Sequence, residues 1–174
     1  METNATSVST TSVGFRYGLL TALVSILCSF VLNIMHQESS PARYLTFAIL
    51  IGGMVLAMNY FKQQNRGFMG FGEGVGIGAA LSAVVGLLSG IFAYVYMTFI
   101  DTEMMTRMTD KLRADMEARG GLSDEQIDQA VAMSSKFANG PFMIFAALLG
   151  TILIGVLLSL VISAFIKNAQ PEFE

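Results

Sequence analysis

Methionines are the side chains of this sequence whose type and spacing could most readily do chemistry. A group of them lies in the second half of the chain: Met97, Met104, Met105, Met108 and Met116. A thioether is a soft ligand, so Met104, Met105 and Met108 offer a copper(I) site, which predicts stoichiometric metal that is lost on substitution by leucine. Methionine also fills irregular apolar gaps, and helical spacing explains the group without a metal. We favour this second interpretation.

Glu73 is the one carboxylate beside an apolar segment of the chain. An ionisable side chain at membrane depth often serves a proton or ion relay, which makes Glu73 a weak functional candidate together with Arg66. We favour a simpler role, in which Glu73 begins a helix, is stabilised by the helix dipole and pairs with Arg66. Cys28 and His36 each stand alone, so no nucleophile–base pair forms. We therefore expect no enzymatic activity, metal or cofactor.

Small residues recur at intervals of four along one apolar segment, at Gly74, Gly78, Ser82, Gly86 and Gly90. Glycine weakens a helix by about 1 kcal/mol relative to alanine. Within a membrane, however, small residues at this interval let two helices approach closely, so this small-residue stripe predicts helix packing. Each step of four residues drifts by about 40° around a helix. We therefore expect one crossing to follow only part of the stripe, and this helix to touch more than one neighbour.

Other apolar segments carry shorter rows of small residues that could face the stripe: Gly14, Gly18 and Ala22; Gly53 and Ala57; and Gly155, Ser159 and Ser163. Packing within one four-helix bundle is the interpretation we favour. Homodimerisation through a glycine face and a substrate-lining face are the alternatives. The alternating glycines of residues 72–78 do not follow the G-x-G-x-x-G spacing and follow no strand, so they predict no nucleotide site.

The elements that must position these residues are membrane-spanning helices. Apolar residues make up 53% of the 174-residue chain and charged residues only 13%, against about 25% charged in soluble domains. A helix of about 20 apolar residues crosses a bilayer. The sequence therefore predicts an all-α integral membrane protein over residues 14–168, between a disordered tail (1–13) and a C-terminal tail (169–174), with spans at about 15–35, 44–61, 75–100 and 141–166. The net charge of −3 argues against a nucleic-acid partner.

A polar segment, residues 101–139, separates the last two spans and predicts an extramembrane hairpin of two amphipathic helices. Asp101 or Thr102 can cap the first helix, which ends near Gly120. Ser123 and Gln126 form a capping box at the start of the second. The hairpin is suited to a protein partner, and its excess of acidic residues disfavours adhesion to anionic lipid.

Orientation follows from the basic residues near the span ends. Four spans place both termini on one side of the membrane, with Arg16, Lys62, Arg66 and Lys167. The other side carries two more basic residues than these, so a literal count puts the hairpin in the cytoplasm: Arg43, Arg107, Lys111, Arg113, Arg119 and Lys136. We nevertheless favour cytoplasmic termini and a periplasmic hairpin, because the first group lies densely at the ends of short connections.

Several short motifs occur in an order that resembles a known family: Lys62, Asn65 and Gly67; Phe71-Gly72-Glu73 and Gly78; Ile100-Asp101; Gly121-Leu122-Ser123; Glu125-Gln126-Ile127; and Ile162 to Lys167. Over about residues 10–168 the chain resembles the bacterial four-span membrane family catalogued as domain of unknown function 4199. Thr102 stands where the family has proline, which leaves that turn less rigid. The resemblance implies a bacterial inner-membrane location and assigns no activity, ligand or catalytic residue.

These observations leave three functions open. We favour a non-enzymatic structural or protein-interaction component of the bacterial inner membrane, with the 101–139 hairpin facing a protein partner or a second copy of the chain. A small transporter or channel component is the first alternative, and a polar groove beside Glu73 would favour it. A copper(I)-binding membrane protein is the second.

Overall fold

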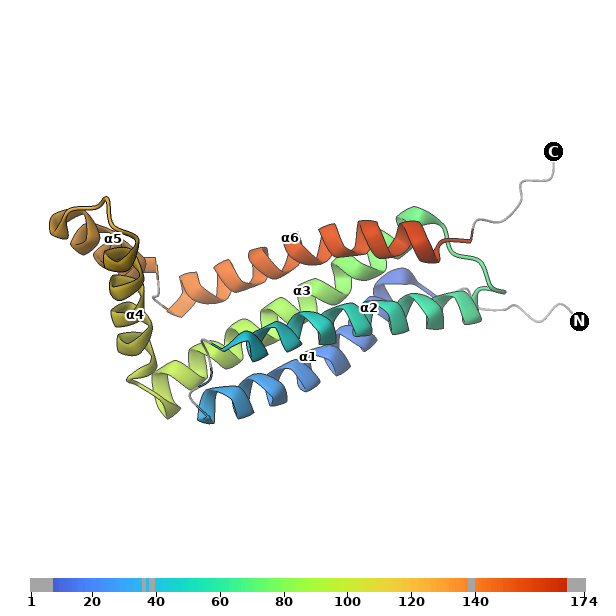
Figure 1. Cartoon of the computed structure of the whole chain (residues 1–174). Helices are drawn as coiled ribbons and strands as arrows, with labels where there is room; N and C mark the ends of the chain where they lie inside the picture. Colours follow the sequence, from blue (N-terminus) through green and yellow to red (C-terminus); the bar gives the residue numbers. More distant parts are fainter. Residues whose placement is uncertain (1–7, 36, 38–39, 138–139, 169–174) are drawn as a thin grey trace, which may run out of the picture. The chain divides into compact units, whose positions relative to one another are not determined.

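A computed structural model describes residues 8–35, 37, 40–137 and 140–168 (Figure 1). The sequence predictions for residues 1–7, His36 and residues 169–174 lie outside the described residues. Within them the structure is helical, and the elements in chain order are α1 (Thr10–Ile34), a 3-10 turn η1 (Pro41–Tyr44), α2 (Leu45–Gln64), α3 (Phe71–Val95), a π-helical turn η2 (Tyr96–Ile100), α4 (Met104–Arg119), α5 (Asp124–Phe137) and α6 (Gly140–Ile166).

Four of these helices are long and apolar enough to cross a membrane: α1, α2, α3 with η2, and α6. The predicted all-α, four-span fold is therefore confirmed. Two helices begin earlier than predicted, α1 at Thr10 and α3 at Phe71. The first turns of α1 are rich in serine and threonine, which favour a helix weakly, but Val13 packs into the core and is only 2% exposed. Packing of one apolar face outweighs intrinsic propensity here.

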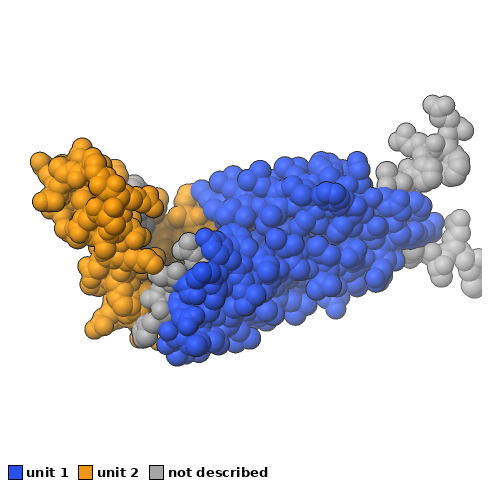
Figure 2. All heavy atoms as spheres, in the orientation of Figure 1, with its two compact units in different colours: residues 1–89, 148–174 blue, residues 90–147 orange. Residues whose placement is uncertain are grey.

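The chain divides into two compact units, coloured separately in Figure 2. Unit 1 holds residues 1–89 and 148–174, and unit 2 holds residues 90–147. Unit 1 therefore contains α1, α2, most of α3 and most of α6. Unit 2 contains α4, α5, the end of α3 with η2, and the first turns of α6.

The core of unit 1 is built from side chains of all four long helices and of the α2–α3 loop. Methionines are prominent in it, and Met54, Met58 and Met69 are fully buried. Their unbranched side chains fill irregular gaps between helices that small residues bring close together. Two contacts fix which helix ends adjoin. The Tyr17 and Tyr60 rings lie 5.4 Å apart, so α1 begins beside the end of α2, and Arg16 lies over the same Tyr60 ring at 5.8 Å.

Burial in α6 is reversed relative to a helix of a soluble protein. Its buried residues are Gly155, Ser159 and Ser163, all small. Its large apolar side chains point outward, among them Leu153, Leu157, Val161 and Phe165. In water this arrangement would expose the apolar surface that folding normally removes, whereas lipid chains solvate such a surface as well as a protein core would. The burial pattern thus supports membrane insertion independently of helix length.

In unit 2, α4 packs against α5. Ile127 and Val131 form the buried face of α5, and an ion pair joins Arg113 of α4 to Asp128 of α5. The predicted capping box is present at the start of α5. The Ser123 amide donates to Gln126 Oε1 at 2.9 Å, and the Gln126 amide donates to Ser123 Oγ at 3.3 Å.

The expected cap of α4 by Asp101 or Thr102 is wrong. The helix begins at Met104, and its N-cap residue Glu103 makes no side-chain cap hydrogen bond. Asp101 instead receives two hydrogen bonds from the Arg107 guanidinium, at 3.1 and 2.6 Å. A bidentate charged pair is a stronger interaction than a single cap bond, so the Asp101 carboxylate is used across the turn that precedes α4.

Candidate functional site

The small-residue stripe of α3 faces a second small-residue row on α6. In unit 1, Cβ atoms built on Gly74 and Gly78 would overlap the side chains of Ser163 and Ser159. At the next contact the glycine lies on α6 and the serine on α3, because a Cβ on Gly155 would overlap Ser82. Successive contacts advance by four residues on α3 and retreat by four on α6, so the two helices are antiparallel and in register.

The next contact of the stripe brings the two backbones together. A Cβ on Gly86 would lie 2.9 Å from Thr151 Cβ and 3.1 Å from Leu148 Cα. Backbone atoms cannot move aside as a side chain can, so position 86 accepts only glycine without a shift of the helices. In unit 2, Gly90 makes a similar approach, with a built Cβ 3.2 Å from Ile144 Cα and 3.3 Å from Ala147 Cβ.

The expectation that one crossing follows only part of the stripe is wrong, because every member of it meets a residue of α6. The drift of about 40° per step that we calculated applies to one straight helix. The α6 row repeats at the same interval of four and drifts equally. Two such rows stay in contact when the helices wind around each other, which the right-handed crossing of small-residue pairs allows.

A different face of α3 packs against α1, so α3 has two close neighbours, as expected. A Cβ on Gly14 would lie 2.6 Å from Ala80 Cβ, and one on Gly18 would lie 2.9 Å from Val84 Cβ. On α2, a Cβ on Gly53 would overlap Thr21 of α1. The short rows predicted on α1, α2 and α6 are thus all placed at contacts between helices of this chain.

Two serine hydroxyl groups along the α3–α6 contact donate hydrogen bonds to backbone carbonyls of their own helices. Ser82 Oγ donates to the Gly78 carbonyl of its own helix at 2.7 Å, and Ser159 Oγ donates to Val156 O at 2.8 Å. Ser163 Oγ points to Met58 Sδ of α2 at 3.9 Å. Hydroxyls that bond back to their own helix leave the contact itself to van der Waals packing.

The loop between α2 and α3 has an unusual backbone that sets the direction of both helices. Arg66 and Gly67 both have positive φ, 55° and 86°. The Gly67 amide donates to Lys62 O at 2.7 Å, which closes the end of α2. Glycine adopts this left-handed conformation without strain, whereas any residue with a side chain would be strained at position 67. Asn65 Nδ2 donates to Phe68 O at 3.2 Å and holds the turn closed.

This loop is bonded to the end of α6 by a group of residues that we call the loop clasp: Lys62, Gly67, Met69, Ile166 and Asn168. Met69 and Asn168 form an antiparallel bridge, with N–O distances of 2.9 and 3.0 Å. Asn168 Nδ2 also donates to Gly67 O at 2.9 Å. Lys62 Nζ donates to Ile166 O at 2.9 Å, where the final carbonyls of a helix lack intrahelical partners.

Glu73 lies in the first turn of α3, as predicted, but its partner is different. Glu73 Oε2 accepts a hydrogen bond from the Gly70 amide at 2.6 Å. Among the described residues no ion pair joins Glu73 to Arg66, so the expected pairing is wrong. The cause is local, because the loop brings an unsatisfied amide at the helix start next to the carboxylate, while Arg66 is exposed in its left-handed position.

The methionines of the copper hypothesis differ in their surroundings. Met104 is buried at 6% exposure, Met105 is half-buried, and Met108 is 48% exposed. Cys28 is half-buried on α1. Within the described residues no group of three or more His, Cys, Asp or Glu side chains could hold a metal ion. Copper binding by thioethers alone stays a prediction.

The sequence predicts no hydrogen-bonding role for Lys62, Asn65 or Asn168, and apart from the family resemblance Lys62 enters it only as a basic residue of the orientation argument. The available signal was a lysine directly after the second predicted span with an asparagine three residues further on, and an asparagine two residues after the last span. Lys62, Asn65 and Gly67 did enter through the family resemblance, and the structure shows what each contributes to the loop and its clasp.

Four long apolar helices, one of which (α6) buries only small residues and exposes its large apolar side chains, define a multi-pass helical membrane protein. The chain belongs to the family described as protein of unknown function (DUF4199), whose profile matches residues 16–168. No curated protein and no solved structure matches the chain.

Proposed function

We propose that this protein is a non-enzymatic structural or protein-interaction component of the bacterial inner membrane, with α4 and α5 as its partner-facing part. The observation that carries the proposal is the closeness of α3 to α6, where the contact leaves no room for one added carbon at Gly78 or Gly86. A transport path needs polar or ionisable groups around a space between helices. Close packing along this face favours a structural role.

The surroundings of Glu73 support the same choice. A relay carboxylate must exchange a proton or ion with groups along a path through the membrane. Glu73 lies at the start of α3 and already accepts a short hydrogen bond from the Gly70 amide. The hydrogen bond from Gly70 to the Glu73 carboxylate stabilises the start of α3. It accounts for an acidic residue at this position without a role in transport.

Surface chemistry supports α4 as the side that meets a partner. Unlike the spans, α4 exposes charged side chains of both signs along its length, among them Asp110, Lys111, Arg113, Asp115 and Glu117. Two small exposed residues, Ala114 and Ala118, lie four apart and therefore on one face of the helix. Small residues on this face let a second helix or loop approach closely, and the surrounding charges favour a partner with complementary charges.

Photo-crosslinking in native membranes tests this role. A photoreactive residue at Ala114 or Ala118 is expected to give a discrete protein adduct that mass spectrometry identifies. The matched control is Leu157 of α6, which is 64% exposed and faces lipid in our assignment, so its adducts should be lipids. Absence of a protein adduct at both α4 positions, or the same adduct from Leu157, would contradict the proposal.

We further propose that the termini are cytoplasmic and that α4 and α5 are periplasmic. Helical spans are typical of an inner membrane, since outer-membrane proteins cross as β-barrels. Arg16, Lys62, Arg66 and Lys167 lie at the helix ends that the loop clasp and the Tyr17–Tyr60 contact bring to one end of unit 1. Reporter fusions at Gly121 and after Glu174 should report periplasm and cytoplasm respectively. The opposite pattern would reverse the assignment.

A further inference from the structure

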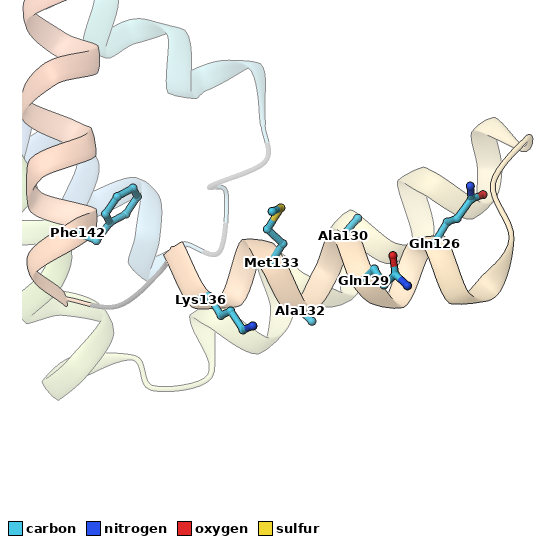
Figure 3. A pocket seen from close by; sticks show the side chains of 7 residues that line it. All are labelled: Gln126, Gln129, Ala130, Ala132, Met133, Lys136 and Phe142. Atoms are coloured by element: carbon cyan, nitrogen blue, oxygen red, sulfur yellow. The ribbon is translucent and has the colours of Figure 1, made fainter.

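Unit 2 contains an open groove of about 800 Å³ along α5, whose walls include Met133, Lys136 and Phe142 (Figure 3). Lys136 and Phe142 already take part in other interactions. Asp128 lies on the same helix, and the first turn of α5 is acidic. The groove therefore offers little to an anionic ligand, and the basic residues of unit 1 are the better candidates for binding one.

The charges of unit 1 are unbalanced at the end of the bundle that holds the loop clasp, which we call the clasp end. The described residues there carry one acidic side chain, that of Glu73, and four basic ones: Arg16, Lys62, Arg66 and Lys167. The Glu73 carboxylate already accepts a hydrogen bond from the Gly70 amide. An anion that approaches the clasp end therefore meets an excess of positive charge.

Arg16 differs from the other cations of this end because an aromatic ring holds its side chain in place. Its guanidinium carbon lies 5.8 Å from the centre of the Tyr60 ring. A ring contact uses one face of the guanidinium, and the N–H groups in its plane still can donate to a ligand. Helices α1 and α2 contain no acidic residue, and no carboxylate of the described chain pairs with Arg16. Its charge is therefore available to an anion.

Exposed leucines continue from Arg16 and Tyr60 toward the middle of the membrane. Leu20 lies one turn further along α1, and Leu56 lies one turn back along α2, so each is on the same side of its helix as the polar residue above it. They are 54% and 62% exposed. The two helices pack against each other. We call the outer surface formed by Arg16, Leu20, Leu56 and Tyr60 the α1–α2 seam.

The polar end of the seam lies where a bilayer changes from hydrocarbon to headgroups. Tyr60 is four residues from the end of α2, which has 20 residues and is a candidate span. It therefore lies about 6 Å from the end of a helix about 30 Å long, which matches the hydrocarbon core in thickness. Tyrosine is typical of this depth, and an arginine here extends its charged group toward the headgroups.

We propose that the α1–α2 seam binds one anionic phospholipid, with its phosphate on the Arg16 guanidinium and an acyl chain along Leu20 and Leu56. A guanidinium binds a phosphate through two parallel N–H···O bonds. A soluble phosphate compound would satisfy Arg16 but would leave the leucines uncovered, whereas a lipid covers both. The positive excess of the clasp end disfavours the ammonium group of a zwitterionic lipid. The inference rests on the spans α1 and α2 and not on the proposed function.

Native mass spectrometry of the full-length protein in detergent tests the preference for an anionic headgroup. Phosphatidylglycerol and phosphatidylethanolamine with the same acyl chains are the probes. We expect one phosphatidylglycerol to be retained under conditions that remove phosphatidylethanolamine. Arg16→Gln should weaken this retention about fivefold, the effect of one basic residue near an anionic lipid. Lys167→Gln is the matched control and should leave retention unchanged, because Lys167 is an exposed cation of the clasp end that follows α6.

Photo-crosslinking in liposomes distinguishes a bound lipid from bulk lipid. Phosphatidylglycerol with a diazirine in its acyl chain should label Leu20 and Leu56, and Arg16→Gln should reduce this labelling. Leu157 of α6, which is 64% exposed, should be labelled by bulk lipid equally in both proteins. Arg16 is exposed, so the variant should keep the wild-type size-exclusion profile, which separates loss of lipid from loss of fold.

A soluble competitor tests the other source of phosphate. Glycerol 3-phosphate at millimolar concentration should not displace phosphatidylglycerol, and displacement would show that the site selects the phosphate alone. Equal retention of the two lipids, or equal effects of Arg16→Gln and Lys167→Gln, would also overturn the proposal. So would labelling of Leu20 and Leu56 that Arg16→Gln leaves unchanged, because the lipid along the seam would then be bulk lipid.

Discussion

Combining Gly78→Leu with Gly86→Leu is expected to lower the unfolding temperature of the detergent-solubilised protein by roughly 10 °C. Each leucine would place a Cβ where α6 already lies, against Ser159 at one position and against the Leu148 backbone at the other. The helices would have to separate, and the van der Waals contact that holds them in lipid would be lost. Overpacking of this kind costs up to about 3 kcal/mol, and occasionally more. The temperature at which half of the folded size-exclusion peak disappears measures the effect.

Glycines on two other membrane helices provide matched controls. Cβ atoms built on Gly52 of α2 and Gly150 of α6 meet nothing within 4 Å. A leucine side chain at either position would project into open space, and leucine favours a helix more than glycine does. Gly52→Leu and Gly150→Leu should therefore leave the unfolding temperature unchanged or raise it slightly. If the controls and the Gly78/Gly86 variant behave alike, the α3–α6 contact does not hold the bundle together.

Exchanging the members of one pair tests the register directly. Gly78→Ala alone should destabilise, because its Cβ would overlap Ser159 Cβ and lie 2.9 Å from Ser159 Oγ. Adding Ser159→Gly removes both atoms, and the remaining Ser159 Cα lies at an ordinary contact distance of 3.5 Å. We therefore expect the exchanged pair to regain most of the lost stability. A second-site change that gives no recovery would show that these two positions do not face each other.

The span number and the fold class could be predicted because a bilayer imposes a simple rule on composition and length. Long uncharged segments have few alternatives in lipid, since each backbone polar group must bond within its own helix. The helix boundaries were harder. Thr10 and Phe71 begin helices among residues that favour loops, and their helical turns depend on burial of Val13 and on the bond between Glu73 and Gly70. The burial of Val13 requires the folded chain, and the Glu73–Gly70 bond requires the turn that precedes α3, so intrinsic helix propensity reveals neither.

The small-residue stripe could also be predicted, but its partner could not. An interval of four identifies Gly78 and Gly86 as packing residues, whichever helix they meet. The antiparallel register with α6 depends on how a glycine on one helix is matched by a serine or threonine on the other. A single sequence shows both rows but does not show their alignment. The stripe stays in contact with α6 along its whole length because the facing row on α6 drifts around its own helix by the same angle.

The pairing of Glu73 with Arg66 failed for a different physical reason. Charge and spacing favoured an ion pair, but a left-handed backbone at Arg66 and Gly67 turns the chain sharply before Gly70. The turn presents a backbone amide to the carboxylate at 2.6 Å. An amide that would otherwise lack a partner at a helix start outweighs an exposed ion pair, which contributes about 0–1 kcal/mol.

The loop clasp gives the second large expected effect. Lys62→Met keeps the aliphatic part of the side chain and removes the ammonium group that donates to Ile166 O. A hydrogen bond from a charged donor contributes about 1.5 kcal/mol or more, so amide hydrogens over residues 160–168 should exchange about tenfold faster. Adding Asn168→Ala removes the bond from Asn168 Nδ2 to Gly67 O and should raise the factor to about thirty.

Lys167→Met is the control that separates the effect of the Lys62–Ile166 hydrogen bond from the effect of a positive charge at the end of α6. Lys167 carries the same charge beside the same helix end, and its exposed side chain makes no hydrogen bond or ion pair with the described residues. It should therefore leave exchange over residues 160–168 unchanged. If Lys62→Met and Lys167→Met accelerate exchange equally, the lysines act through general attraction to the helix dipole. If only Lys62→Met does so, the α2–α3 loop holds the end of α6 through a specific bond, and the family motif at Lys62, Asn65 and Gly67 has a structural purpose.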